Sequence, residues 1–348
     1  MALFGRSAST VGLDIGSGLV KLVPINHEPT GPVLARVTFE PMPTDAIVEG
    51  EVMDPGLVTQ AIRNAFSAAG VKPRNVVTAV GGRDVIIKKI GMDRMTDREA
   101  REVIRWEAEQ HVPFDMDNVE LDFQILDPEG SEPTMQVLLV AAKRELVEHK
   151  MALLSEAGVQ PAMIDVDAFA LHNAFALNYP EAMRGLVGLV NIGHETTNVN
   201  ILEDGVPILT RDLPIGTRRF REDLMREQGM AGDQATRLVE GRMDPAGLLD
   251  AVLATRTEEL AVGVDRAAAF LQTSTRSGAG LTRLYTSGGG ARIPGLGAAL
   301  GKQLGLPLQV ANPLERLTVD VGALGALSAD EVAPLLMLPI GLGLREVA

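Results

Sequence analysis

Three short polar turns carry the residues of this chain that could do chemistry. In the first, Asp14 ends an apolar run, the turn Gly16-Ser17-Gly18 follows, and Lys21 lies in the next apolar run. Backbone N–H groups of such a turn can point at an anion, and a lysine adds positive charge. An aspartate can hold hydrated Mg²⁺, because this ion keeps several waters and needs few protein carboxylates. The first turn therefore suits a phosphate with its metal ion, although an ordinary solvated hairpin fits the same residues.

A second stretch, much further along the chain, repeats this plan. Residues 190–193 are Val-Asn-Ile-Gly where residues 13–16 are Leu-Asp-Ile-Gly, and each is followed by a polar turn and another apolar run. Strand–turn–strand units repeated far apart in sequence indicate two related domains. Ligand sites are common in the cleft between domains, so we expect Gly193 and Thr197 to face the first turn across such a cleft.

The third turn is a run of glycines. A short apolar stretch over residues 284–287 leads into Gly288, Gly289 and Gly290, and a helix is expected from about residue 295. Backbone without side chains at a strand–helix junction allows a flat ring or a phosphate to come close. This turn is therefore a candidate for contact with the same ligand.

The elements that position these turns follow from local patterns. Asp54 is expected to cap a helix that has Pro55 at its first position and ends at Gly70. Thr96 and Glu99 form a capping box that starts a second helix. Residues 121–126 and 135–141 are expected to pair as strands, and a long helical region, broken near residues 244–245, is expected over 218–275. Residues 321–327, rich in small side chains, are expected to form another helix.

Composition limits the possible functions. With 348 residues, the chain can form two or more domains with proper cores. Its formal net charge of −14 argues against a nucleic-acid partner and against adhesion to an anionic membrane. The absence of cysteine excludes disulfides and thiolate chemistry, and the five histidines lack metal-ligand spacing. No leader is recognised, and no run approaches about 20 apolar residues, so a cytoplasmic protein without membrane insertion is expected.

Taken together, the three turns resemble the ligand loops of the actin-like ATPase superfamily, which includes actin, the Hsp70 chaperones and sugar kinases. The resemblance implies an α/β protein of two ribonuclease H-like domains that binds ATP and Mg²⁺. It implies nucleotide contacts by residues of the two phosphate loops and the adenosine loop, with Asp14 also as the metal ligand. These residues are Asp14, Gly16, Ser17, Gly18, Lys21, Gly193, Thr197, Gly288, Gly289 and Gly290.

Longer stretches resemble the PilM family, the cytoplasmic actin-like components of type IV pilus assembly. The stretches are residues 112–114, 121–126, 137–143, 156–159, 164–167 and 340–345, so the resemblance covers essentially the whole chain. It implies a small subdomain, 1C, inserted into the first domain, as in the bacterial division protein FtsA. The expected subdomains are 1A over 1–75, 155–184 and 321–348, 1C over 76–154, 2A over 185–216 and 280–320, and 2B over 217–279.

Some positions depart from the superfamily pattern. Asn191 stands where aspartate is usual, and a neutral amide weakens Mg²⁺ binding and activation of the attacking water. Glu195 brings a negative charge beside the second turn. Thr236 and Val239 lack the charged pair that relatives place at the ribose and the base. We therefore expect nucleotide binding with weak or absent hydrolysis.

The resemblance also implies a partner. Family members are recruited to the inner-membrane pilus platform by the N-terminal cytoplasmic tail of the membrane protein PilN, an extended peptide held between 1A and 1C. A groove with free strand edges suits such a peptide, because main-chain hydrogen bonds supply affinity. The expected wall residues are Ile47, Val48, Glu49, Val52, Trp106 and Glu109. Solvated surface fits the carboxylates equally well, and for Trp106 a core anchor is the favoured interpretation over a partner pocket.

Two other functions fit the same superfamily. One is a small-molecule kinase, which requires a substrate base and intact phosphate loops, so the altered second loop argues against it. The other is a filament-forming protein like FtsA, since both share the insert. Turnover of ATP would distinguish the first, and light scattering with ATP the second.

Overall fold

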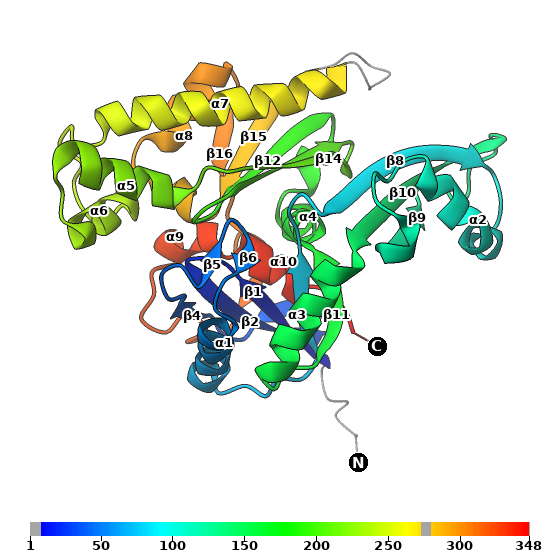
Figure 1. The fold of residues 1–348 in the computed structure, drawn as a ribbon, viewed down its shortest axis with the longest axis horizontal. Coiled ribbons are helices and arrows are strands. Elements are labelled where there is room, and N and C mark those ends of the chain that lie inside the picture. The colour runs from blue at the N-terminus through cyan, green and yellow to red at the C-terminus, as the bar shows by residue number, and fades with distance from the viewer. Residues whose placement is uncertain (1–7, 273–279, 348) are drawn as a thin grey trace.

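The computed structural model describes residues 8–272 and 280–347, which form two lobes and a smaller module beside them (Figure 1). The first lobe surrounds a sheet with the strand order β11-β7-β1-β2-β3-β17, in which β4 also pairs with β2. Its strands are β1 (Ala8–Ile15), β2 (Leu19–Glu28), β3 (Gly31–Leu34), β4 (Thr38–Pro41), β7 (Val76–Val80), β11 (Pro161–Val166) and β17 (Thr318–Val319). A separate hairpin joins β5 (Ile47–Val48) to β6 (Glu51–Val52).

The second lobe surrounds a five-stranded sheet with the order β14-β13-β12-β15-β16. These strands are β12 (Leu186–Ile192), β13 (Thr197–Glu203), β14 (Val206–Leu213), β15 (Arg283–Ser287) and β16 (Leu308–Val310). The β12, β13 and β15 strands are almost wholly buried, because helices cover the sheet (Figure 1).

The two sheets repeat one topology. In the first, β3, β2 and β1 run as an antiparallel meander, and β7 and β11 continue the sheet in parallel. In the second, β14, β13 and β12 form the meander, and β15 and β16 continue in parallel. The predicted duplication of a strand–turn–strand unit is therefore confirmed, and it extends to two further strands in each lobe.

The small module is a third sheet with the order β8-β10-β9, covered by α2 (Asp97–Glu109). Its strands are β8 (Val85–Asp93), β9 (Val119–Ile125) and β10 (Thr134–Lys143). The expected boundary of the insert at residue 76 differs from the structure, because β7 pairs with β1 and β11 inside the first lobe. Likewise β17 pairs with β3, so residues 318–319 belong to the first lobe rather than the second. Long-range pairing decides both boundaries, and local sequence does not report it.

Helices complete the lobes. They are α1 (Pro55–Ala69), α2 (Asp97–Glu109), α3 (Arg144–Glu156), α4 (Asp167–Asn178), α5 (Thr217–Gln228), α6 (Gly232–Val239), α7 (Asp250–Gln272), α8 (Leu296–Leu304), α9 (Ala329–Val332) and α10 (Met337–Gly343). The short 3₁₀ segments are η1 (Met116–Asn118), η2 (Pro180–Met183), η3 (Gly289–Arg292) and η4 (Ala333–Leu335). No described helix is long and apolar enough to cross a membrane.

Several local predictions are confirmed by the helix ends. The Asp54 side chain accepts from the Leu57 N–H, and Gly70 ends α1 in the left-handed conformation. The capping box of Thr96 and Glu99 is present in both directions at the start of α2. The helix expected over residues 321–327 is wrong, because this glycine-containing segment forms turns.

The two lobes share an apolar core at their base. It joins Val77 of the first sheet and Val187 of the second through Phe175 on α4 and residues of α10. The short helix α10 packs against both β1 and α4. This close packing depends on glycine, because a Cβ on Gly341 would lie 1.7 Å from the Ala170 carbonyl oxygen. The lobes are thus joined by this shared core, and a cleft separates them beyond it.

Candidate functional site

A cavity of about 1300 Å³ lies between the lobes. Ligand sites in proteins commonly measure about 300–1000 Å³, so a nucleotide-sized ligand fits in the cavity. Its lining includes eight of the ten predicted nucleotide-contact residues, namely Asp14, Gly16, Ser17, Gly18, Lys21, Gly193, Gly288 and Gly289. Thr197 and Gly290 do not line it. The Thr197 hydroxyl is buried and donates to the Ile215 carbonyl at 2.7 Å, and Gly290 packs against Ile192.

The two hairpin turns have the same internal geometry and touch each other. The Gly16 N–H donates to the Leu19 carbonyl at 3.0 Å, and the Gly193 N–H donates to the Thr196 carbonyl at 2.8 Å. A Cβ on Gly18 would lie 2.9 Å from Cγ of His194, so only glycine lets the turns approach this closely. The turns of the two related domains therefore meet at one place in the cleft, as the sequence predicts.

Asp14 and Lys21 form an ion pair inside the first hairpin. They are direct partners in the β1–β2 register, and the Lys21 Nζ lies 2.6 Å from the Asp14 Oδ2. Both side chains are largely buried. The carboxylate that was predicted to hold the metal is thus already paired with a cation of the protein.

Two further charged groups in the cleft were missed in the sequence. Asp167 begins α4, and Lys150 lies on α3. Burial raises the pKa of Asp167 to about 7, and the negative charge of Asp14 adds to this effect. Burial also lowers the pKa of the Lys150 amine, which the charges of Asp167 and Asp14 oppose. The stretch over residues 164–167 was noted only as a family likeness, and nothing distinguishes Lys150 from a surface lysine on an amphipathic helix.

The second lobe offers neutral or hydrogen-bonded groups where a metal would need charge. The Asn191 Oδ1 accepts from the Ser287 hydroxyl at 3.0 Å, so its oxygen is engaged. Burial raises the pKa of Asp212, although the Asn198 amide donates to its carboxylate at 2.8 Å. Within the described residues, no group of three or more His, Cys, Asp and Glu side chains could hold a metal ion. This donor set fits a directly coordinated Mg²⁺ poorly.

A network of ion pairs and one hydrogen bond joins the two lobes across the cleft. One Arg218 nitrogen lies 2.8 Å from the Glu195 carboxylate and 2.9 Å from Asp45, which belongs to the first lobe. The other Glu195 oxygen accepts from the Glu49 N–H at 2.6 Å. Asp45 and Glu49 both have positive φ, which is unfavourable for residues other than glycine. The glutamate that was noted as a departure in the second turn therefore fastens the lobes to each other.

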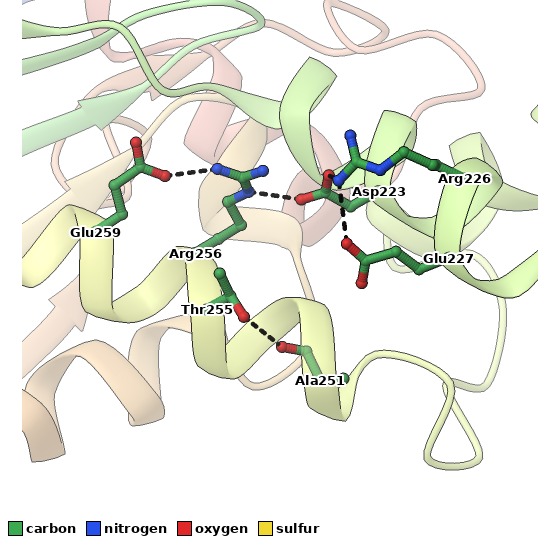
Figure 2. A network of polar contacts seen from close by, with 7 residues as sticks. All are labelled: Asp223, Arg226, Glu227, Ala251, Thr255, Arg256 and Glu259. Atoms are coloured by element: carbon green, nitrogen blue, oxygen red, sulfur yellow. Dashed lines mark hydrogen bonds and ion pairs between the residues drawn. The ribbon is translucent and has the colours of Figure 1, made fainter.

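The helix that carries Arg218, α5, is anchored to α7 by a network of ion pairs around Asp223 (Figure 2). Buried Asp223 on α5 accepts from Arg256 on α7 at 2.6 Å and also pairs with Arg226. Burial opposes the charge of Asp223, but the two arginines outweigh it and hold the pKa of this carboxyl below its usual range. Arg256 also contacts Glu259 at 2.6 Å. This network fixes α5 against α7 and so positions the cations at the start of α5.

The end of the cavity beside the glycine run has its own polar group. Arg292 donates to the Glu240 carbonyl at 3.1 Å, and both residues line the cavity together with Thr236 and Val239. The Thr236 hydroxyl donates to the Gly232 carbonyl within α6 at 2.8 Å. Thr236 and Val239 of α6 therefore offer this end of the cavity no charge, and Arg292 lines it as a cation.

The residues predicted to bind a peptide fall in two separate places. Ile47, Glu49 and Val52 of the β5–β6 hairpin line the cleft, and neighbouring Val48 is half-buried. Trp106 and Glu109 lie on α2, on the outer module (Figure 1). The Trp106 side chain is 73% exposed, so its interpretation as a core anchor is wrong. The structure does not bring the two groups together.

The duplicated lobes and their paired turns over one cleft define an actin-like ATPase fold. Solved structures share this fold. The structure of MreB5 of Spiroplasma citri bound to AMPPNP is 12% identical in sequence to this chain, with a TM-score of 0.54, and the match covers 97% of this chain and 95% of that one. The ethanolamine utilization protein EutJ from Carboxydothermus hydrogenoformans gives 18% identity, a TM-score of 0.56 and coverage of 97% and 89%. The fold predicted from the sequence is confirmed.

Within this class, the chain belongs to the family described as type IV pilus assembly protein PilM, whose model matches residues 12–347. A solved PilM-PilN type IV pilus biogenesis complex is 29% identical, with a TM-score of 0.81 over 99% of this chain and 100% of that one. The cell division protein FtsA of Bacillus subtilis (strain 168) is 24% identical over 238 residues, which are 62% of this chain. The chain spans about half of that relative, 53% of its length.

Proposed function

We propose that this protein is a nucleotide-binding actin-like component of type IV pilus assembly. The observation that carries the proposal is the cavity into which the first and second hairpin turns and the glycine run all open. Turn N–H groups suit phosphate oxygens, and Gly288 and Gly289 leave room for a ring beside bare backbone. The match to a solved structure that contains AMPPNP supports this use of the fold.

Hydrolysis is expected to be slow or absent. The neutral Asn191 and the paired Asp14 offer an attacking water little activation by a metal ion. We therefore assign the nucleotide a structural or regulatory role. If a Mg²⁺ ion accompanies it, Asp14 and the Asn191 oxygen are the groups that would contact its water shell.

The proposal is tested by ligand-induced stabilisation. Mg-ATP at about 100 times its Kd stabilises a protein by about 3 kcal/mol, so the melting temperature should rise. Asp14→Asn should reduce this rise, while Glu129→Gln on the exposed loop beside β10 should not change it. Each variant is compared with its own ligand-free melting temperature, because Asp14→Asn leaves Lys21 unpaired and destabilises the protein itself. No rise in the parent protein at millimolar Mg-ATP would refute nucleotide binding.

We further propose that the protein binds the N-terminal cytoplasmic tail of a PilN partner and so associates with the inner-membrane pilus platform from the cytoplasm. Support comes from the likeness, over nearly the whole chain, to the protein in a PilM-PilN complex. We place the tail between the first lobe and the small module, whose outer strand β9 is an edge of its sheet. Such an edge offers main-chain hydrogen bonds to an extended peptide.

The two groups of predicted wall residues allow this placement to be tested separately. Binding of a synthetic tail peptide is measured for the parent, for Glu49→Lys on the β5–β6 hairpin, and for Trp106→Ala on α2. A weaker affinity in one variant assigns the peptide to that side. Unchanged affinity in both would remove this placement, and absence of binding by the parent would refute the partner itself.

A further inference from the structure

The cations that line the cleft fall into two groups. Five of them have a carboxylate partner within 4.0 Å, and these are Lys21, Arg83, Lys143, Arg218 and Arg292. Two others, Lys150 and Arg221, have no carboxylate partner at this distance among the residues that the structure describes. The Arg221 Nε is buried and has no hydrogen-bond partner there either. Within the described part of the chain, these two side chains are the cations of the cleft lining that form no ion pair within 4.0 Å.

Lys150 and Arg221 belong to opposite lobes. Lys150 projects into the cavity from α3, which packs against α1, β7 and β11 of the first lobe, and it lies close enough to Asp14 and Asp167 to feel their charge. Arg221 projects from α5 of the second lobe, and its charge acts on His194 in the second hairpin turn. Lys150 is therefore near the first hairpin, at Asp14, and Arg221 is near the second hairpin, at His194.

Leaving such groups without a partner is unfavourable. Both residues are half-buried, and a charge withdrawn from water costs free energy unless it is paired and hydrogen-bonded; an arginine cannot escape the cost by losing its proton. The nearby acids relieve it only in part: the charge of Asp167 acts on Lys150, but Asp167 lies beyond 4.0 Å and burial raises its own pKa to about 7. Asp14 is committed to Lys21 at 2.6 Å, and Glu195 to Arg218 at 2.8 Å. Burial lowers the pKa of the Lys150 amine even though the charges of Asp167 and Asp14 act in the opposite direction.

We propose that Lys150 and Arg221 bind the phosphate oxygens of the nucleotide, one from each lobe. This inference rests on the proposed function and adds to it two side chains that hold the phosphates of the nucleotide. The protein's own cations then supply charge that the poor metal donor set does not. Because the two residues belong to different lobes, the polyphosphate also bridges the cleft near the meeting point of the turns.

The test compares ligands that differ only in phosphate. Calorimetry measures the affinity of the full chain for ATP, ADP and adenosine, using Lys150→Met and Arg221→Met. Arg219→Met, on the exposed side of the same helix α5, and Arg144→Met, at the start of α3 outside the cavity, are the matched controls. A charge-assisted hydrogen bond to phosphate corresponds to a loss of about tenfold to a hundredfold in affinity when it is removed.

We expect each cleft variant to lose at least about tenfold for ATP and less than about threefold for adenosine, with both controls close to the parent. Lys150→Arg should retain most of the ATP affinity. Parent-like ATP binding by both cleft variants would overturn the inference, and so would an equal loss for adenosine, because that indicates a structural effect. A parent protein that binds none of the three ligands refutes the proposed function instead.

Discussion

Asp167 provides a quantitative test of the electrostatics of the cleft. Its pKa of about 7 in the folded protein compares with an ordinary value of 3.8. An acid with a raised pKa binds more protons in the folded state, so its ionisation destabilises the protein. The penalty is small below about pH 4, grows as the pH rises toward about 7, and is constant above that.

The magnitude follows from the two pKa values. Between about pH 5 and pH 8 the ionisation of Asp167 should cost about 2 to 3 kcal/mol of folding free energy. Asp167→Asn removes this term, so its stability relative to the parent should increase by that amount over the same interval. Comparing the two pH values cancels any pH-independent effect of the amide, such as a changed contact with Gly81.

Urea denaturation of the parent and of Asp167→Asn at constant ionic strength measures the difference directly. Asp320→Asn, an exposed carboxylate outside the cleft, is the control and should follow the parent at both pH values. If the stability difference between Asp167→Asn and the parent were the same at about pH 5 and pH 8, the acid would titrate normally. Asp167 would then not be desolvated in the cleft beside Asp14, contrary to the electrostatics described above.

Other predictions address the anchor of α5, the base of the lobes and the metal. Arg256→Met should destabilise the protein by about 3 to 5 kcal/mol in urea denaturation, because buried Asp223 loses its best partner; a change below about 1 kcal/mol would contradict this. Gly341→Ala should lower the free energy of unfolding by about 3 kcal/mol or more, because its Cβ would lie 1.7 Å from the Ala170 oxygen. Gly297→Ala should lower it by about 1 kcal/mol or less, because its Cβ would meet only a side-chain methyl of Leu308 at 3.2 Å. Equal effects of the two substitutions would refute the packing argument. Replacing Mg²⁺ by EDTA should weaken ATP binding by less than about tenfold in calorimetry, and a loss above about a hundredfold would indicate a directly coordinated metal.

The sequence was sufficient for features encoded by neighbouring residues. The hairpins around Gly16 and Gly193, the cap at Asp54 and the capping box at Thr96 all depend on interactions over a few residues. Repetition of one such unit then led to the two-lobed fold. The same reasoning failed for the start of the small module, because pairing of β7 with β1 involves residues more than sixty positions apart.

Parts of the candidate site could not be read from the sequence for a related reason. Lys150 and Asp167 approach Asp14 only because α3 and α4 converge on the cleft, and nothing local distinguishes them from surface charges. Glu195 was recognised as unusual, but its role depends on Arg218 and Glu49, which come from two other segments. In contrast, Thr197 matched the motif and yet faces the interior, since a pattern does not specify which way a strand residue points.

The apolar core that both lobes share limits how the molecule can open. The rings of Phe175, Tyr179 and Tyr285 pack against one another within it, with centroids 4.7 to 5.2 Å apart, and they connect α4 of the first lobe to β15 of the second. Pulling the lobes apart at this level would expose these rings to water, whereas parting Arg218 from Asp45 at the rim would only hydrate an ion pair. A ligand should therefore enter by rotation of the two lobes about their shared apolar core, which stays packed. The gap would widen progressively toward the rim, so rotation about the base would admit and release the proposed nucleotide.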